Sequence, residues 1–192
     1  FLDKETTLEL AEHKIDFTGV DLNLNFNVTP DAEIKIIFND KLEDEITAHG
    51  QGDLAITLNS IGDITMDGVY AITDGAYDFS MGILKQKFYI EDGGSINWSG
   101  DPYNATLDLK TYYRVDANIA TAQGNKLSTT GSSDQEILCY LNLKESLIKP
   151  AIDFNIKAPR ASDVEKSILT QINSDQAELN RQFFSLLLWK RF

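Results

Sequence analysis

The chain has 192 residues, of which 42% are hydrophobic and 24% charged, and its 17 basic and 30 acidic residues give a net charge of −13. This composition is that of a folded protein with one domain or two small ones, and it excludes intrinsically disordered and collagen-like chains. The negative charge argues against nucleic acid as a partner, because neutralising a phosphate backbone requires a basic surface.

The first predicted element lies at residues 21–28, which read D-L-N-L-N-F-N-V. Leucine, phenylalanine and valine occupy every second position and asparagine the positions between them. Because successive side chains of a strand point to opposite faces, this alternation predicts a β-strand with one apolar and one polar face.

The same two-residue period recurs along the chain between glycine, aspartate, asparagine and proline residues, which favour turns. We predict further strands at 34–38, 54–58, 64–72, 77–81, 88–90, 96–98, 107–115, 137–143 and 152–156. We predict turns at 50–53, 73–75, 92–94 and 100–102. About ten short strands at such spacing, with no helices between them, indicate an antiparallel meander.

Two segments interrupt this regularity. The apolar positions are odd-numbered at 77–81 and even-numbered at 88–90, so a bulge or turn is expected within 82–87. Residues 118–133 are mostly polar, and we interpret them as a long hairpin tip or mobile loop.

Helices are predicted only after Pro159, which ends the last strand. Ser162 and Glu165 have the spacing of a capping box, and apolar residues then recur at helical spacing. Ser174 is the expected cap of a second helix, whose tail reads R-Q-F-F-S-L-L-L-W-K-R-F and is unusually apolar for a terminus.

The sequence offers little for catalysis, metals or disulfides. It contains no nucleophile elbow, phosphate loop, dinucleotide fingerprint, EF-hand loop or zincin spacing. Cys139 has no partner within the chain and alternates with apolar residues, which predicts a buried structural thiol, and His13 and His49 lack the spacing of a zinc site. We therefore expect no enzyme activity, no cofactor and no metal.

No segment predicts a membrane span or a signal peptide. The longest apolar stretch, 183–189, is far shorter than the ~20 residues that a spanning helix needs. Because the chain begins at Phe1 without a methionine, we interpret it as a fragment or processed product of a longer protein, with any anchor outside it.

Alternation leaves two architectures open. One is a closed sandwich or barrel, and the other is an unclosed, U-shaped sheet whose apolar concave face holds lipid chains, because both require the same pattern. The inward set is rich in leucine, isoleucine and phenylalanine, and no second covering layer is evident, which favours the open form.

Several short runs together carry a resemblance to a known family. They are G-V-Y at 68–70, G-A-Y at 75–77, G-S-I-N-W-S-G-D-P at 94–102, L-D-L at 107–109 and the tail from 179 to 192. As a set they resemble the C-terminal domain of the TamB family, a component of the translocation and assembly module. Each run alone is short, and the set covers most of the chain.

The resemblance implies a mainly β fold, an elongated antiparallel sheet rolled into an open apolar groove (a β-taco), with one or two short C-terminal helices. It implies a groove domain at 1–160 and a helical tail at 161–192. It also implies a periplasmic protein that is anchored in the inner membrane and reaches the outer membrane, where it meets a barrel of the TamA or BamA type.

With this resemblance, the apolar strand positions become candidate groove residues and the tail becomes a candidate docking segment. The candidate groove residues are Leu22, Leu24, Phe26, Val28, Ile34, Ile36, Phe38, Leu54, Ile56, Leu58, Ile64, Met66, Phe79, Phe88, Ile90, Ile96, Trp98, Leu107, Leu109, Leu141, Leu143, Ile152, Phe154 and Ile156. The candidate docking residues are Leu179, Phe183, Phe184, Leu187 and Trp189.

The function expected first is a bridge-like conduit that shields phospholipid acyl chains between the two membranes, linked to outer-membrane biogenesis. The alternative is an adaptor that binds an outer-membrane barrel, either through an open sheet edge or through the tail. An enzyme acting on carbohydrate or lipid is the least favoured, because no acid and base pair has a supporting context.

Overall fold

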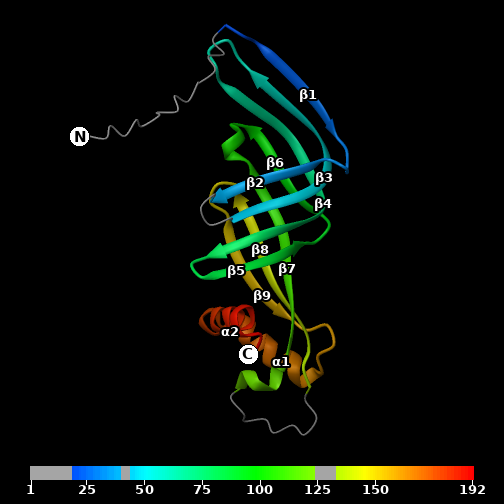
Figure 1. Cartoon of the computed structure of the whole chain (residues 1–192), viewed down its shortest axis with the longest axis vertical. Coiled ribbons are helices and arrows are strands. Elements are labelled where there is room, and N and C mark those ends of the chain that lie inside the picture. The colour runs from blue at the N-terminus through cyan, green and yellow to red at the C-terminus, as the bar shows by residue number, and fades with distance from the viewer. Residues whose placement is uncertain (1–18, 40–43, 124–132) are drawn as a thin grey trace, which may run out of the picture.

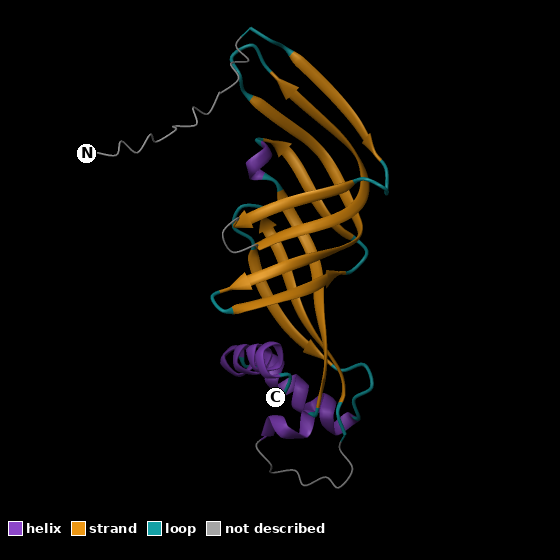
Figure 2. Cartoon of the chain, in the orientation of Figure 1, coloured by secondary structure: helices purple, strands orange, loops and turns teal. Residues whose placement is uncertain are grey.

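The computed structural model describes residues 19–39, 44–123 and 133–192. They form one antiparallel sheet, followed by two α-helices packed at one end of it (Figures 1 and 2). The strands are β1 (Leu22–Val28), β2 (Glu33–Asn39), β3 (Asp44–Leu58), β4 (Ile64–Met81), β5 (Leu84–Ile90), β6 (Gly94–Gly100), β7 (Thr106–Ala117), β8 (Gln135–Ser146) and β9 (Ala151–Lys157). The helices are α1 (Asp163–Ser174) and α2 (Gln176–Trp189), with short 3₁₀ turns η1 (Pro102–Asn104) and η2 (Ile119–Gln123).

The predicted fold class is confirmed: the described residues are mainly β, their strands pair antiparallel, and the sheet they form is not a barrel. The strands follow the order β1-β3-β4-β5-β7-β8-β9, with β2 beside β3 and β6 between β4 and β7. Within the described ranges, no pairing joins the β1 and β2 edge to β9, so the sheet stays unclosed.

The sheet bends along one line. β1 and β2 pair with successive parts of β3, and β6 and β5 pair with successive parts of β4, so each pair behaves as one strand broken in the middle. The breaks at 29–32 and 91–93 align with a register shift beside His49 and Gly50. As a result β2 and β5 run across the view in Figure 1, whereas β7, β8 and β9 run along the long axis.

Two predicted turns are wrong, and both errors have the same cause. Residues 50–53 and 73–75 lie inside the long strands β3 and β4, which merges the predicted strands 64–72 and 77–81. A side chain at Gly50 would place its Cβ 2.2 Å from the carbonyl oxygen of Ala71 and 2.8 Å from the ring of Tyr70. These glycines permit close backbone approach and do not reverse the chain.

Thr73 is the extra residue at this level of β4. His49 pairs with Asp74, but Gly50 pairs with Ile72, which leaves Thr73 opposite no residue of β3. Its hydroxyl donates to the His49 carbonyl at 3.2 Å. This bulge shifts the inward positions of β4 from even to odd numbers, and the further shift expected within 82–87 occurs at the turn between β4 and β5.

The first predicted helix begins as expected and the second does not. Ser162 and Glu165 form the capping box of α1, with the Ser162 amide donating to Glu165 Oε2 at 2.8 Å. The cap of α2 is Asp175 and not Ser174: its carboxylate accepts from the amides of Ala177 and Glu178. A carboxylate also complements the positive end of the helix dipole, which a serine does not.

The polar segment predicted as a loop contains the 3₁₀ turn η2 near its start. Residues 124–132 of this segment lie outside the described residues. Among the helices that the structure describes, none is long and apolar enough to cross a membrane. The division into domains at residue 160 stays a prediction, although α1 and α2 share one core with the sheet.

Candidate functional site

An apolar face remains uncovered where β1 lies beside the second half of β3 and the first half of β4. Leu22 pairs with Leu58, which pairs with Ile64. The next two rows of paired residues across the three strands are Leu24, Ile56 and Met66, and then Phe26, Leu54 and Gly68. Directly paired residues point to the same side of a sheet. We call this set the open face; it comprises Leu22, Leu24, Phe26, Leu54, Ile56, Leu58, Ile64 and Met66.

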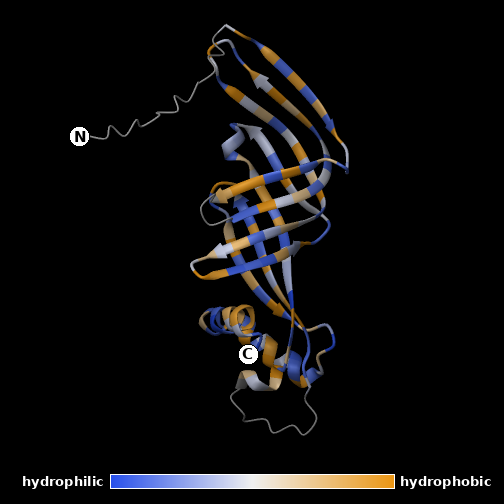
Figure 3. Cartoon of the chain, in the orientation of Figure 1, coloured by the Kyte–Doolittle hydropathy of each residue, from blue (hydrophilic) through white to orange (hydrophobic). Residues whose placement is uncertain are grey.

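The reverse side of these strands is polar. Asn27 donates to Asp53 at 2.8 Å, and Thr57 donates to Asn23 at 3.1 Å, between neighbouring strands. Figure 3 shows the resulting alternation of hydrophobic and hydrophilic residues along the strands at this end of the molecule. The predicted alternation of 21–28 is therefore confirmed, with the asparagines on the polar side of the sheet.

Large apolar side chains of the open face are exposed to solvent. Leu24 is 38% exposed, Phe26 44% and Ile64 51%. Leu54 and Leu58, on the central strand, are largely covered by their neighbours. Contiguous apolar surface of this kind on a folded domain marks a binding surface more often than scattered single residues do.

Tyr70 forms the lower boundary of the open face. Its ring is fully buried against Gly50, and its hydroxyl donates to the carbonyls of Ala32 at 3.2 Å and Ala48 at 3.3 Å. Burial raises the pKa of Tyr70, so the hydroxyl stays protonated and keeps its role as a donor. The side chain thereby ties the turn before β2 to the bend of the sheet.

Beyond Tyr70 the inner side of the sheet is a packed core. Half of the predicted groove residues are buried against other protein side chains; most of them lie in this core, whereas Leu54 and Leu58 belong to the open face. These buried residues are Leu54, Leu58, Phe79, Phe88, Ile90, Ile96, Trp98, Leu107, Leu109, Leu141, Leu143 and Ile156. Val28, Ile34, Ile36, Phe38, Ile56, Met66 and Phe154 are half-buried, and Leu22, Leu24, Phe26, Ile64 and Ile152 are exposed.

Helix α2 closes this end of the molecule. Phe183 is completely buried, with its ring stacked on Phe88 of β5 at 6.3 Å and packed on Phe154 of β9 at 4.3 Å. The side-chain amide of Gln86 also donates to the Leu187 carbonyl at 3.0 Å. The helix therefore bridges two parts of the sheet that the bend brings together.

The same packing buries three of the five predicted docking residues. Leu179, Phe183 and Leu187 lie in the domain's own core, so they are not available as a docking surface in this structure. Phe184 is half-buried, and Trp189, which is 64% exposed, is the one of the five that faces solvent. The apolar face of an amphipathic helix is covered here by the sheet rather than left for a partner.

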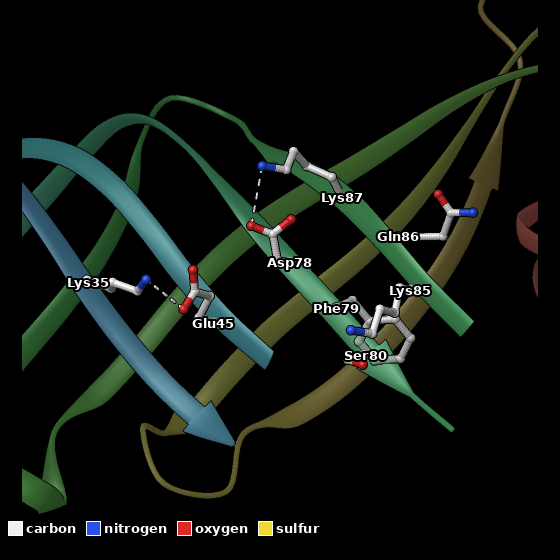
Figure 4. A pocket seen from close by; sticks show the side chains of 8 residues that line it. All are labelled: Lys35, Glu45, Asp78, Phe79, Ser80, Lys85, Gln86 and Lys87. Atoms are coloured by element: carbon white, nitrogen blue, oxygen red, sulfur yellow. Dashed lines mark ion pairs between the residues drawn. The ribbon is translucent and has the colours of Figure 1, made fainter. Parts of the chain in front are cut away.

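The outer side of β2 to β5 carries ion pairs around a cavity of about 480 Å³ (Figure 4). Lys35 Nζ lies 2.8 Å from Glu45, and Lys87 Nζ lies 3.3 Å from Asp78. Such partly exposed pairs contribute little to stability. Ser80 also lines the cavity, but its buried hydroxyl has no hydrogen-bond partner, so no base activates it.

The described residues offer no other centre for chemistry. No group of histidine, cysteine, aspartate and glutamate side chains suited to a metal ion occurs among them. Cys139 is buried as predicted, and burial raises the pKa of its thiol far above the ordinary value, so it is not a reactive thiolate.

Comparison with known proteins agrees with the resemblance carried by the short runs. The family described as TamB C-terminal domain matches residues 1–192, the whole chain. No curated protein matches the chain. The match covers the open face, the packed core and both helices.

Proposed function

The chain belongs to the TamB C-terminal domain family, and on that premise we propose that its open face holds phospholipid acyl chains during transfer between the inner and outer membranes. Members of this family are non-enzymatic, periplasmic envelope components with a role in outer-membrane assembly and lipid transport. We further propose that the protein is anchored in the inner membrane and reaches the outer membrane.

The observation that carries the proposal is the exposed apolar area of the open face. Removing apolar surface from water stabilises a complex by roughly 25 cal/mol per Å². An alkyl chain laid along Leu24, Phe26 and Ile64 would cover side chains that now face solvent. Rows of similar side chains give little preference for one position, which suits a chain that slides.

The packed core limits where on the sheet an acyl chain can bind. The open face ends at Tyr70, and Phe183 of α2 fills the space at the opposite end. An acyl chain therefore occupies the open end and does not pass through the core while α2 stays in place. The lipid headgroup remains in water beside the unclosed sheet.

Photocrosslinking from adjacent residues tests the proposal. Leu24 and Asn25 are neighbours on β1, both exposed, and point to opposite faces. A photoreactive side chain at position 24 should capture phospholipid in the cell envelope, and one at position 25 should not. Equal capture from the two positions would contradict the proposal. Ile56→Asp, which places a charge on the face, should reduce capture from position 24.

An adaptor role is the second candidate, because Trp189 offers an exposed anchor. It lines a cavity of about 530 Å³ together with Arg181, Arg191 and Phe192. We infer that a barrel of the TamA or BamA type docks at this end. Trp189→Ala should weaken binding to the barrel and leave capture from position 24 unchanged, whereas unchanged barrel binding would remove this candidate.

A further inference from the structure

A separate cavity of about 630 Å³ lies between α1 and the outer side of β8 and β9. We call it the α1 pocket. None of the residues of the open face lines it. Its volume falls within the range of small-molecule sites, which is roughly 300–1,000 Å³.

The floor of the α1 pocket is apolar and held in place. Leu138, Leu169 and Pro159 supply hydrocarbon surface from a strand, a helix and the turn between them. The amide of Asn173 donates to the Ile156 carbonyl at 2.8 Å and accepts from the Ile156 amide at 2.9 Å. This pair of hydrogen bonds fixes α1 against the edge strand, so the pocket is preformed.

The charge of the α1 pocket is opposite to that of the chain. Lys157 and Lys166 line it and no carboxylate does, although the chain as a whole carries a net charge of −13. Lys166 lies 3.5 Å from Asp163, which is fully exposed and screened by water. A bound anion would therefore meet two ammonium groups with little competition from the pocket itself.

Tyr140 positions one of these lysines. The Lys157 ammonium lies over the Tyr140 ring, 5.1 Å from its centroid. The Tyr140 hydroxyl donates to Glu91 at 3.0 Å, and Glu91 also accepts from Lys110. Glu91, whose charge attracts Lys157, is therefore already bound by two other donors, Tyr140 and Lys110.

We propose that the α1 pocket binds a single-chain anionic amphiphile whose headgroup carries a phosphate. The alkyl chain covers the apolar floor, and the phosphate lies between Lys157 and Lys166. This site shares no lining residue with the open face, so it is independent of the lipid-carrying role of that face.

Three probes separate the contributions. Because an alkyl chain would also bind the open face, the titrations use the Leu24→Asp variant, which places a charge on that face. Lauroyl lysophosphatidylglycerol, below its micelle concentration, should bind this variant at 1:1 stoichiometry in calorimetry. Monolauroylglycerol, which lacks the phosphate, and glycerol phosphate, which lacks the chain, should each bind at least about tenfold more weakly. No binding of the first probe, or equal binding of the first two, would overturn the proposal.

Variants locate the site. Thr170 lines the pocket from the exposed side of α1, so Thr170→Trp should fill it and abolish binding, whereas Gln171→Trp, one residue on and outside the lining, should not. Lys157→Gln should weaken binding about tenfold. Binding that survives Thr170→Trp would overturn the assignment. Because Leu24→Asp blocks the open face in every titration, binding at the α1 pocket is separable from the fate of that face.

Discussion

Two matched substitutions test where the domain is packed and where it is open. Phe183 is completely buried between Phe88 and Phe154, whereas Phe26 on the open face is 44% exposed. Replacing each by alanine deletes the same atoms. Only the first substitution leaves a cavity surrounded by protein.

The structure sets the two magnitudes apart. Phe183→Ala should lower the free energy of unfolding by about 3–5 kcal/mol, because it removes buried surface, creates a cavity and deletes three ring contacts. Phe26→Ala should cost about 1 kcal/mol, since roughly half of the ring is already in water and no closed cavity forms.

Urea unfolding measures both values. The midpoint should fall strongly for Phe183→Ala and slightly for Phe26→Ala, with the slope of each transition unchanged. Equal losses of unfolding free energy would refute the reasoning, because they would mean that Phe26 is as enclosed as Phe183 and that the open face is covered.

Three further predictions follow from local geometry. Gly68→Ala should lower the unfolding free energy by more than about 1 kcal/mol, because φ is +133° and the new Cβ would lie 2.2 Å from the Asp53 carbonyl oxygen; urea unfolding measures the loss. The Ser162 amide holds the pKa of Glu165 below its ordinary 4.5, so wild type should be more stable than Glu165→Gln above that pH, and the difference should shrink as the pH falls below it, in unfolding measured at several pH values. Cys139 should resist a thiol reagent at neutral pH and react when the chain is unfolded in urea; rapid reaction of the folded chain would contradict its burial.

The sequence predicts the strands well because alternation is a local signal. The alternating residues of β1 predict both the strand conformation and which residues share a face. The register with β3 then places leucine opposite leucine. The capping box at Ser162 is equally local, since it depends on a spacing of three residues. Both features are therefore readable without knowledge of distant contacts.

What the sequence does not reveal depends on contacts between distant residues. The glycines at 50–53 resemble a turn, and only the close approach of β4, through the Ala71 and Val69 carbonyl oxygens and the ring of Tyr70, explains why they belong inside a strand. Phe183 resembles an exposed anchor until the bend of the sheet brings Phe88 and Phe154 to it. The pairing of β5 and β6 with successive parts of β4 is likewise invisible in a periodicity.

The site is predicted in part for the same reason. Inward positions follow from alternation, but which of them remain uncovered depends on where the sheet bends and on what α2 covers. Leu24 and Leu109 have the same pattern in the sequence, yet the first is exposed and the second completely buried. The α1 pocket has no sequence signal, because Lys157 and Lys166 meet only when α1 packs on the sheet edge.

Native mass spectrometry of the 192-residue chain, purified gently from the cell envelope, tests the central claim most directly. If the open face holds acyl chains, the chain should carry a phospholipid adduct that is lost in the Leu24→Asp, Phe26→Asp variant and retained in Asn25→Asp on the polar side. Absence of an adduct, or an adduct equally abundant in both variants, would contradict the account.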